Sequence, residues 1–522
     1  MNLLKKSKLR KNKITKMMND LPKVETPSTD LIFKEDLETN LDEIKKELGN
    51  CSDLVIRNIL VGNQELAIVY IEGLADSDRI NKSIITPITS HMSESENIRE
   101  HLLTNLCKKV ITNAQIKEKF DRNELILSVL SGDTLLLVNG FTEGIVLGTK
   151  GWSDRGVMEP SSQNVVRGPK DAFSETLRTN TALIRRRIKH PTLRIDSKRI
   201  GKLTATDVAI VYLEGIVNPE VVKEVNRRLD EIKIDSILEG GYIEELIQDK
   251  TITPFPTMFN TERPDSVVAN ILEGKVAILV DGTPFVLTVP AMFVEYFQAS
   301  EDYYHRSDFA SFIRLLRFVS FLMALLIPSA YIAVTTFHQE MLPTSLLISL
   351  AANHEGVPFP AVVEVMIMEL TFEILREAGI RLPKAVGTAI SIVGALVIGE
   401  SAVTAGLVSP AMVIVVSFTA ITSFVIPSYD MGIAIRMLRF VFIFLSATFG
   451  LYGIVLGIIV LVLHLCSLSS FGIPYMISVG PFHLSDQKDS LIRLPWSILK
   501  KRPSHNKLNS MRQPDNSSEN GG

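Results

Sequence analysis

The 522-residue sequence has few cysteines, and their positions argue against two kinds of site. Cys51, Cys107 and Cys466 fit neither the spacing of a metal-ligand set nor a disulfide framework. This usage agrees with a reducing compartment for the water-exposed part of the chain. A large basic excess is also missing, since 55 Lys and Arg stand against 58 Asp and Glu, and we therefore expect no nucleic-acid partner.

The sequence lacks the glycine orders that bind phosphate and any evident catalytic set. Its repeated glycines form neither GxGxxG nor GxxxxGK(S/T). Glu72 and Glu214 resemble a pair of catalytic carboxylates, but each follows an expected strand and precedes a glycine, which favours a solvated or capping role. We therefore expect no enzyme, no cofactor and no metal site.

A secretion signal is missing as well. The first 23 residues contain eight Lys or Arg and one acid, without the apolar stretch of a signal peptide. This composition predicts a disordered basic arm over residues 1–49, with contact to anionic lipid as the alternative. The N-terminal half is accordingly expected in the cytoplasm.

Charge is absent from long stretches of the second half. Asp, Glu, Lys and Arg do not occur between Arg439 and Asp486, which is more than the roughly 20 apolar residues that one crossing of a bilayer needs. Further uncharged runs cover 318–337, 385–399 and 401–429. These runs predict an α-helical membrane domain of five to six hydrophobic segments over 306–485, followed by a polar tail over 486–522.

The first half has the mixed composition of a water-soluble region, and it contains a repeat. Ala67-Ile-Val-Tyr-Ile-Glu-Gly73 matches Ala209-Ile-Val-Tyr-Leu-Glu-Gly215 at an offset of 142, and glycines further along keep the same offset. Continuous apolar runs of this kind suit strands buried on both faces of a sheet. The sequence therefore predicts two similar α/β subdomains, over 50–148 and 192–305, joined by a linker over 149–191.

Local signals complete this picture. Asn218 and Pro219 predict the start of a helix whose apolar face includes Val221, Val225 and Leu229. Asn139-Gly140 and Asp281-Gly282 are the dipeptides that two-residue hairpin turns prefer, and they predict such turns at the end of each copy.

The linker contains Glu159-Pro-Ser-Ser-Gln-Asn-Val-Val-Arg-Gly-Pro-Lys-Asp-Ala-Phe173, followed by an expected helix up to Ile188. Arg167, Gly168 and Pro169 end an extended segment in a turn, and Arg185, Arg186 and Arg187 close the helix with positive charge. Two interpretations remain open for these six residues: a helix cap with surface charge, or a site of interface, coupling or lipid-headgroup contact.

This linker resembles that of the A-subunit family of GerA-type spore germination receptors. The resemblance includes Pro254-Phe-Pro-Thr257 and Arg263-Pro-Asp265 in the second copy. In the membrane half it includes Gly356-Val-Pro-Phe-Pro360, Arg376-Glu-Ala-Gly-Ile-Arg-Leu-Pro383, Gly399-Glu-Ser-Ala-Val-Thr-Ala-Gly-Leu-Val-Ser-Pro410 and Phe471-Gly-Ile-Pro-Tyr475. It thus extends from about residue 50 to about residue 500.

The resemblance implies a nutrient-germinant receptor in the inner membrane of a bacterial spore. It implies a transporter-like B subunit and a lipoprotein C subunit as partners, and a nutrient that acts directly or through the B subunit. It also implies self-association of A subunits into a ring that forms an ion channel.

Basic residues predict the direction of each membrane segment. Arg306, Arg314 and Arg317 precede the first span, and Arg376, Arg381, Arg436 and Arg439 mark later returns to the cytoplasm. The basic tail is expected inside too, so the run 440–485 must cross twice, with Gly450 among the places to bend. A single long helix with an external tail is the alternative.

Three carboxylates within the membrane half are candidates for an ion pathway. Glu364 and Glu369 follow a helix break at 353–360, and Glu400 lies in an otherwise apolar segment rich in small residues. Acids in lipid usually line a cavity or pair with a base, and one acid per chain becomes a ring around a symmetry axis. The alternative for the first two is a wet interfacial helix.

Three functions compete at this point. The first is a germinant-receptor channel subunit that conducts cations, and the second is a solute carrier with a cytoplasmic regulatory domain. The third is a membrane-anchored scaffold that conducts nothing. The membrane half shows no evident internal repeat, which argues against the carrier, and its acids argue against an inert anchor.

Overall fold

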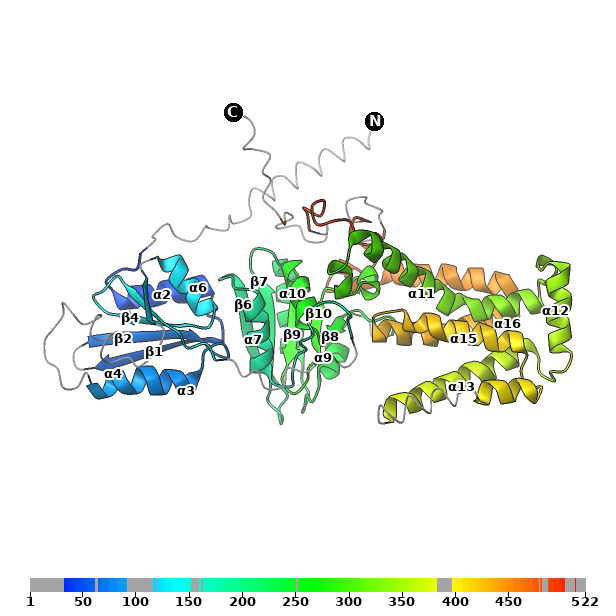
Figure 1. Ribbon diagram of the computed structural model, residues 1–522, viewed down its shortest axis with the longest axis horizontal. Helices are drawn as coiled ribbons and strands as arrows, with labels where there is room; N and C mark the ends of the chain where they lie inside the picture. Colours follow the sequence, from blue (N-terminus) through cyan, green and yellow to red (C-terminus); the bar gives the residue numbers. More distant parts are fainter. Residues whose placement is uncertain are drawn as a thin grey trace, which may run out of the picture.

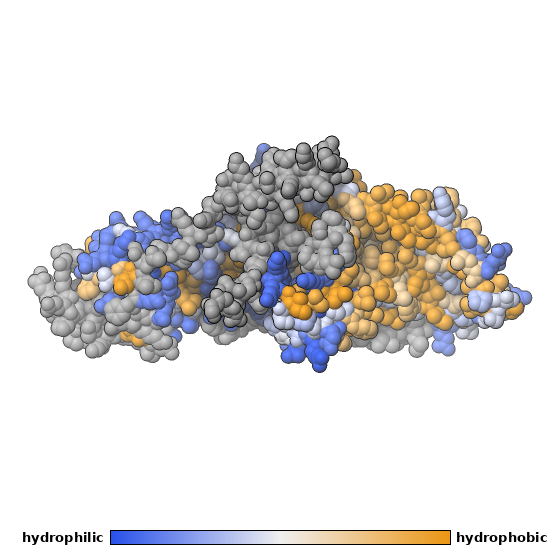
Figure 2. Space-filling model, turned by 90° about the horizontal axis from the view of Figure 1, so that it is seen from above, coloured by the Kyte–Doolittle hydropathy of each residue, from blue (hydrophilic) through white to orange (hydrophobic). Residues whose placement is uncertain are grey.

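The computed structural model describes residues 32–61, 64–91, 116–119, 121–151, 159–160, 163–249, 252–382, 397–477, 479–480, 487–502 and 512. Three bodies follow one another along the long axis of the molecule: two α/β subdomains and a bundle of long helices (Figure 1). Exposed apolar residues gather over the helical body (Figure 2). This confirms the predicted fold class, an α/β soluble region followed by an α-helical polytopic membrane domain.

The first subdomain is an antiparallel sheet with helices on both faces. Its strands are ordered β1-β2-β4-β5-β3. Alternate residues of β2 enter two cores, with Ala67 and Val69 towards α2 and α6, and Leu66 and Ile68 towards α3 and α4. The elements are α2 (Leu37–Leu48), β1 (Leu54–Val61), β2 (Gln64–Ile71), α3 (Ser77–Ile80), a π-helical turn (Asn81–Ile85), α4 (Thr86–His91), β3 (Ile116–Lys119), α6 (Arg122–Leu130), β4 (Thr134–Val138) and β5 (Gly144–Leu147).

The second subdomain repeats this strand order as β6-β7-β9-β10-β8, with α7 and α10 on one face and α8 and α9 on the other. As predicted, Asn218 caps α8 through a 3.1 Å hydrogen bond from Glu220 N, and Pro219 is its first residue. The elements are α7 (Leu177–Arg187), β6 (Leu193–Ile200), β7 (Thr206–Leu213), α8 (Pro219–Glu231), α9 (Gly240–Ile247), β8 (Phe259–Thr261), α10 (Pro264–Leu272), β9 (Val276–Val280) and β10 (Val286–Val289).

The first subdomain begins earlier than predicted. α2 lies inside the stretch expected to be a disordered arm, because Leu37, Leu41, Ile44 and Leu48 form one buried face among charged neighbours. The linker likewise contributes α7 to the core of the second subdomain. Each copy therefore starts with a helix, and the boundaries placed at residue 50 and residue 192 are too late.

The prediction of two-residue hairpin turns is wrong. Five residues, 139–143 and 281–285, join the strands in each copy. The first residue of each dipeptide instead binds the start of a helix. Asn139 Oδ1 accepts a hydrogen bond from Leu37 N at 3.3 Å, and Asp281 Oδ1 accepts one from Leu177 N at 2.9 Å. Each turn thus holds the first turn of the helix that opens its copy.

The helical body contains two helices long and apolar enough to cross a membrane among the described residues, Ser307–Thr336 and Tyr429–Ser467. Residues 397–404 are helical as well. Short 3₁₀ turns (Phe293–Phe297, Ser300–Tyr303) lead into the body and another (Gln339–Met341) follows its first helix. The other elements are α11 (Ser307–Thr336), α12 (Thr344–His354), α13 (Ala361–Arg381), α15 (Pro410–Phe424), α16 (Tyr429–Ser467), β11 (Ser469–Ser470) and β12 (Ile473–Pro474).

The chain reverses direction inside α16. Gly450 has φ 60° and ψ −140°, and a side chain there would meet Phe337 and His338 at the far end of α11. By contrast Asp430 and His464, near the two ends of α16, both contact the second subdomain, through Asn260 and Thr253. α16 is therefore two antiparallel arms, and residues 468–477 return to the soluble body.

Candidate functional site

Two motifs far apart in the sequence meet where the second subdomain joins the helical body. The Tyr475 hydroxyl donates a hydrogen bond to the Pro256 carbonyl at 2.9 Å. Ser470 Oγ donates to the Thr257 carbonyl at 2.7 Å and accepts from Ala291 N at 3.0 Å. We call this contact between residues 253–259 and 468–476 the joint.

Charged groups of the second subdomain complete the joint. Asp249 accepts a 2.6 Å hydrogen bond from Phe471 N and a 2.7 Å one from Arg228. The Arg228 guanidinium also lies 4.3 Å from the centre of the Phe471 ring. The hairpin β11–β12 is thus tied to α8 and to the end of α9.

An aromatic core lies beneath the joint and continues into the bundle. Phe293 packs edge-on against Phe297, Phe321 and Tyr475 at centroid distances of 5.1, 5.8 and 6.0 Å. The same core contains Met431 and Leu465, one from each arm of α16. The second subdomain and the spanning helices therefore share one packed core.

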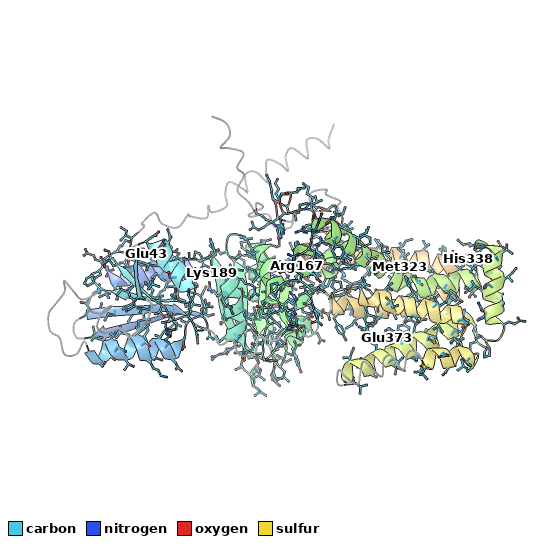
Figure 3. All side chains as sticks on the ribbon, viewed as in Figure 1. Glu43, Arg167, Lys189, Met323, His338 and Glu373 are labelled. Carbon is cyan, nitrogen blue, oxygen red and sulfur yellow. The ribbon has the colours of Figure 1, made fainter. Side chains whose placement is uncertain are left out.

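Residues 163–171 of the linker, here called the strap, lie against residues 301–304, which lead into α11. Arg263 donates to the carbonyls of Gln163 and Pro169 at 3.2 and 3.0 Å. The backbone N–H of Arg167 donates to Glu301 at 3.3 Å, while its side chain is exposed (Figure 3). The strap is thus held mainly through its backbone.

Gly168 is needed at its position. Its φ is +135°, and a side chain there would come within 2.6 Å of the Tyr304 ring. Tyr304 in turn donates to the Asp265 carboxylate at 2.6 Å, which also binds Arg263. The three residues Arg167, Gly168 and Pro169 therefore lie together beside the entry to the helical body.

The three linker arginines have different surroundings. Arg185 is fully buried and binds both carboxylate oxygens of Asp53, at 2.8 and 3.0 Å, and so joins the two subdomains. Arg187 binds Asp171 at 2.6 Å, which holds the helix to the strap. Arg186 is half-buried. Of the three, Arg185 lies at an interface within the chain.

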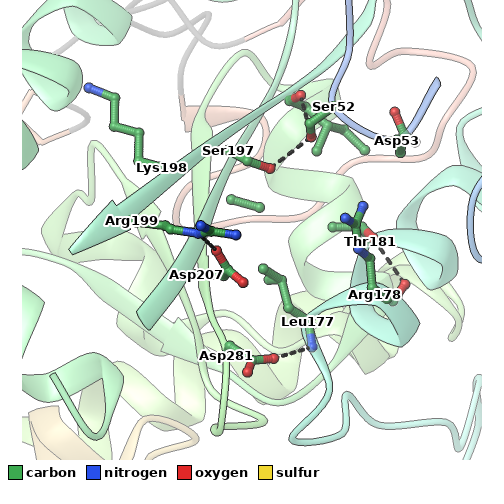
Figure 4. Close-up of a pocket in the computed structure, with 12 residues that line it drawn as sticks. Ser52, Asp53, Leu177, Arg178, Thr181, Ser197, Lys198, Arg199, Asp207 and Asp281 are labelled. Carbon is green, nitrogen blue, oxygen red and sulfur yellow. Dashed lines mark hydrogen bonds and ion pairs between the residues drawn. The ribbon is translucent and has the colours of Figure 1, made fainter. Parts of the chain in front are cut away.

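A cavity of about 420 Å³ lies between the subdomains (Figure 4). Its walls carry both signs of charge, including Arg199 bound to Asp207 at 2.9 Å and Asp281 bound to Leu177 N. This size suits a small polar molecule. The lining is Ser52, Asp53, Leu177, Arg178, Thr181, Ile195, Ser197, Lys198, Arg199, Asp207, Ala209 and Asp281.

Two of the predicted ion-pathway acids lie inside the bundle with partners. Glu369 binds Arg439 at 2.6 Å, both side chains being at most 1% exposed, and Arg439 also donates to the Ala324 carbonyl at 2.9 Å. Glu364 accepts from Ser409 N at 2.7 Å and lies 3.0 Å from His354 Nδ1. Both acids join α13 to its neighbours.

Glu373, which is labelled in Figure 3, is a further acid of α13, and it binds Arg436 at 2.6 Å. The three acids of α13 thus follow one another along the body. Glu373 with Arg436 lies nearest the soluble half, Glu369 with Arg439 comes next, and Glu364 with His354 lies at the far end. Glu400 differs from all of these acids. It is exposed on the helix 397–404 and forms no ion pair with another described residue.

Sequence reasoning missed Asp302, a buried acid at the base of α11. It binds Arg317 at 2.8 Å and Arg314 at 3.3 Å. The signal was present, because two arginines at the start of an apolar helix need an acid if they are to face inward. The joint was missed as well, since nothing in the sequence brings residue 256 near residue 475.

One acid of the soluble half has an altered acidity. Burial raises the pKa of Glu244 in α9 to about 7, and the negative charges of Asp430 and Glu239 add to the rise. Among the described residues no group of three or more His, Cys, Asp or Glu is placed to hold a metal ion.

Comparison with known proteins identifies the family. The Bacillus/Clostridium GerA spore germination protein family matches residues 42–505. Spore germination protein KA of Bacillus subtilis (strain 168) is 50% identical over 477 residues, 91% of this chain and 87% of that protein. Spore germination protein GerLA of Bacillus cereus is 41% identical over 476 residues, 90% of this chain and 96% of that protein.

A solved structure is also similar to part of the chain. The crystal structure of the N-terminal domain of the A subunit of the Bacillus megaterium spore germinant receptor GerK3 is 40% identical, with a TM-score of 0.41, and the match covers 52% of this chain and 99% of that one. The resemblance seen in the motifs is confirmed by the family match and the curated relatives. The chain belongs to the Bacillus/Clostridium GerA family of spore germination proteins.

Proposed function

We propose that this chain is the A subunit of a nutrient-germinant receptor, and that several copies surround a ligand-gated cation path in the spore inner membrane. The family match and the relatives named as spore germination proteins support the first part. The family resemblance also implies a transporter-like B subunit and a lipoprotein C subunit as partners. The proposal assigns no catalytic step.

The observation that carries the channel proposal is the exposure of Glu400. A carboxylate on the surface of an apolar helix is costly in lipid unless it faces water or another chain. Glu400 lies five residues before the turn at Ala405, near the far end of the body. Around a symmetry axis the same residue from each copy forms an acidic ring that attracts cations.

Glu364 and Glu369 support the proposal in a different role. Each is fully buried and bound to a group from another element. Removing one partner of such a pair leaves a buried charge and is strongly unfavourable. We infer that these acids fix α13 against α15 and α16 in the resting state, and that they reach an ion path only if these pairs open.

The orientation follows from the basic residues. Arg317, Arg376 and Arg436 lie near the end of the body that joins the second subdomain, and residues 488–502 return to the same end. Basic residues mark the cytoplasmic side of a membrane protein. We therefore place the soluble half in the cytoplasm, or its counterpart in the spore.

The test is cation flux through the assembled receptor in lipid vesicles, with the wild-type chain and two variants. Glu400→Gln should reduce nutrient-triggered flux about tenfold or more, because it removes the charge of the ring. Glu355→Gln alters an exposed acid in the loop after α12 and serves as the matched control. Unchanged flux in Glu400→Gln would leave this residue as a lipid-facing or packing residue.

Self-association is tested by the mass of the purified chain in a mild detergent, after subtraction of the detergent. A closed assembly of several chains is expected, because one chain supplies a single Glu400. A clean monomer, also in the presence of the B and C subunits, would remove the ring and with it this route to cation selection.

The nutrient acts on this chain or on the B subunit. Within this chain the cavity between the subdomains is the candidate, because its walls offer charges of both signs to a small polar molecule. Calorimetric titration of the nutrient into the purified chain alone and into the receptor distinguishes the two. Heat seen only with the B subunit present would assign the nutrient to that partner.

A further inference from the structure

The segment from Lys488 to Arg502, here called the tail segment, is fixed against the start of α11 (Figure 1, red). Ser311 Oγ donates to the Arg493 carbonyl at 2.9 Å, and Arg493 N donates back to the same Oγ at 3.1 Å. Asp489 accepts from Arg314 at 2.5 Å through its carbonyl and from the Tyr303 hydroxyl at 3.0 Å through its carboxylate. The position of the tail segment along α11 is therefore defined.

This position is close to the membrane surface. Ser311 lies about 10 Å along the helix before Phe318, where the uncharged run of α11 begins. The headgroup layer on each side of a bilayer is about 5 to 8 Å thick. This distance exceeds that thickness, but the exposed apolar surface of α11 begins before Phe318, at Phe312 and Leu315, so the tail segment lies beside the headgroups on the soluble side.

The tail segment turns apolar side chains outward at this level. Ile492, Trp496 and Ile498 are 54%, 49% and 48% exposed, although Arg493 and Leu499 beside them are buried. On the neighbouring surface of α11, Phe312 and Leu315 are also exposed. Tryptophan and aliphatic side chains in such a band are typical of the boundary between headgroups and acyl chains.

The outward charge of the tail segment is positive. Lys488, Lys500 and Lys501 are exposed and form no ion pair with another described residue. The acid of the segment, Asp489, faces inward to Arg314 and Tyr303. An apolar band with lysines around it fits a surface that is apolar within and negative at its edge.

A cavity of about 700 Å³ opens beside these side chains. Lys488, Trp496 and Lys500 line it together with Met292 and Val294. Glu295 in its wall is already bound to Lys275. The space is large enough for a phospholipid headgroup with part of its chain.

We propose that the tail segment is an interfacial anchor that binds anionic phospholipid, with Lys488, Lys500 and Lys501 at the headgroup phosphates and Trp496 and Ile498 at the acyl boundary. Each lysine near an anionic surface contributes about fivefold to such binding. The anchor holds the base of α11, and through Asp489 it holds Arg314 there. The inference needs the membrane position of α11 but not ion conduction.

Trp496 provides the measurement, because the sequence contains two tryptophans. Trp152→Phe leaves Trp496 as the only one in the full chain, which is placed in lipid nanodiscs with the acyl chains brominated in either phosphatidylglycerol or phosphatidylcholine. We expect quenching of Trp496 fluorescence to be at least twice as strong with brominated phosphatidylglycerol. Changing Lys488, Lys500 and Lys501 to Gln should bring this ratio to about one.

The matched control changes three exposed lysines of the second subdomain, Lys189, Lys202 and Lys223, to Gln and should keep the preference. Equal quenching by both lipids in the unmodified chain would overturn the proposal. So would the absence of quenching, which would indicate that another chain covers Trp496. If inorganic phosphate removed the preference in nanodiscs, the site would bind free phosphate rather than lipid.

Discussion

The two α/β copies are alike inside and differ in what they touch. In both, a buried asparagine of the first helix closes the preceding loop: Asn40 bonds to the backbone of Lys34, and Asn180 bonds to that of Ser174. In both, a turn glycine donates its N–H to the carbonyl of the residue before the helix cap: Gly140 donates to Glu35, and Gly282 donates to Glu175. The duplicated unit is thus a complete fold with its own cap, turn and core.

The second copy carries the attachments to the helical body. Its segment before β8 forms the joint through Pro256 and Thr257, and Arg263, the N-cap residue of α10, fixes the strap. The first copy meets the second through the buried pair of Asp53 and Arg185. Among the described residues these contacts thus connect the first copy to the helical body by way of the second.

The largest effect is expected from breaking the contact between the copies. Arg185→Met leaves the Asp53 carboxylate buried without its partner, which should lower the free energy of unfolding by about 3 to 5 kcal/mol. Thermal unfolding of the full chain in detergent measures this loss. Hydrogen exchange should show faster opening of β1 and β6, whose ends meet at this contact.

Two variants sharpen this test. Arg199→Met removes an exposed ion pair to Asp207 and should cost less than about 1 kcal/mol. The double variant Arg185→Met with Asp53→Leu should recover most of the stability, because no buried charge is left unpaired. If Arg185→Met behaved like Arg199→Met, the buried pair would not hold the copies together.

A loss of intermediate size is expected from variants that test whether matching internal contacts contribute equally to the stability of the two copies. Asn40→Ala and Asn180→Ala each leave a backbone N–H and a carbonyl without their partner, and each should cost about 1 to 3 kcal/mol. Hydrogen exchange should place the change in 34–48 for the first variant and in 174–187 for the second. A loss several times larger in one copy would contradict the shared internal design.

The duplication was predictable because a strand buried on both faces keeps an apolar sequence. Ala67–Gly73 and Ala209–Gly215 contain most of β2 and β7, the strands second in order in the two sheets. Of the opening helices, α7 was expected as a helix up to Ile188 but was assigned to the linker, and α2 was missed because its apolar residues are spaced three and four apart among charges. A repeated apolar run reveals buried strands, but it does not reveal an amphipathic helix of this kind.

The membrane half shows where sequence reasoning ends. Glu364, Glu369 and Glu400 look similar as acids in apolar segments, and the sequence places no partner beside them. The partners come from elsewhere in the chain: Arg439 is 70 residues from Glu369, and Ser409 is 45 residues from Glu364. Only the fold separates the two bound acids from the exposed one.

The smallest effect concerns the border of the second copy with α16 and depends on pH. The pKa of Glu244 is raised from 4.5 to about 7, chiefly by burial and then by Asp430. The folded chain therefore holds a proton on Glu244 that the unfolded chain has released, so stability falls as pH rises from about 4.5 to about 7 and is level above. Glu244→Gln should remove this slope, leaving the melting temperature near that of wild type at the acidic end and above it beyond pH 7. Glu245→Gln, on the exposed side of α9, should keep the wild-type slope. If the stability of Glu244→Gln changed with pH as that of wild type does, the pH dependence would belong to other groups. The second copy would then meet α16 without a proton-linked contact.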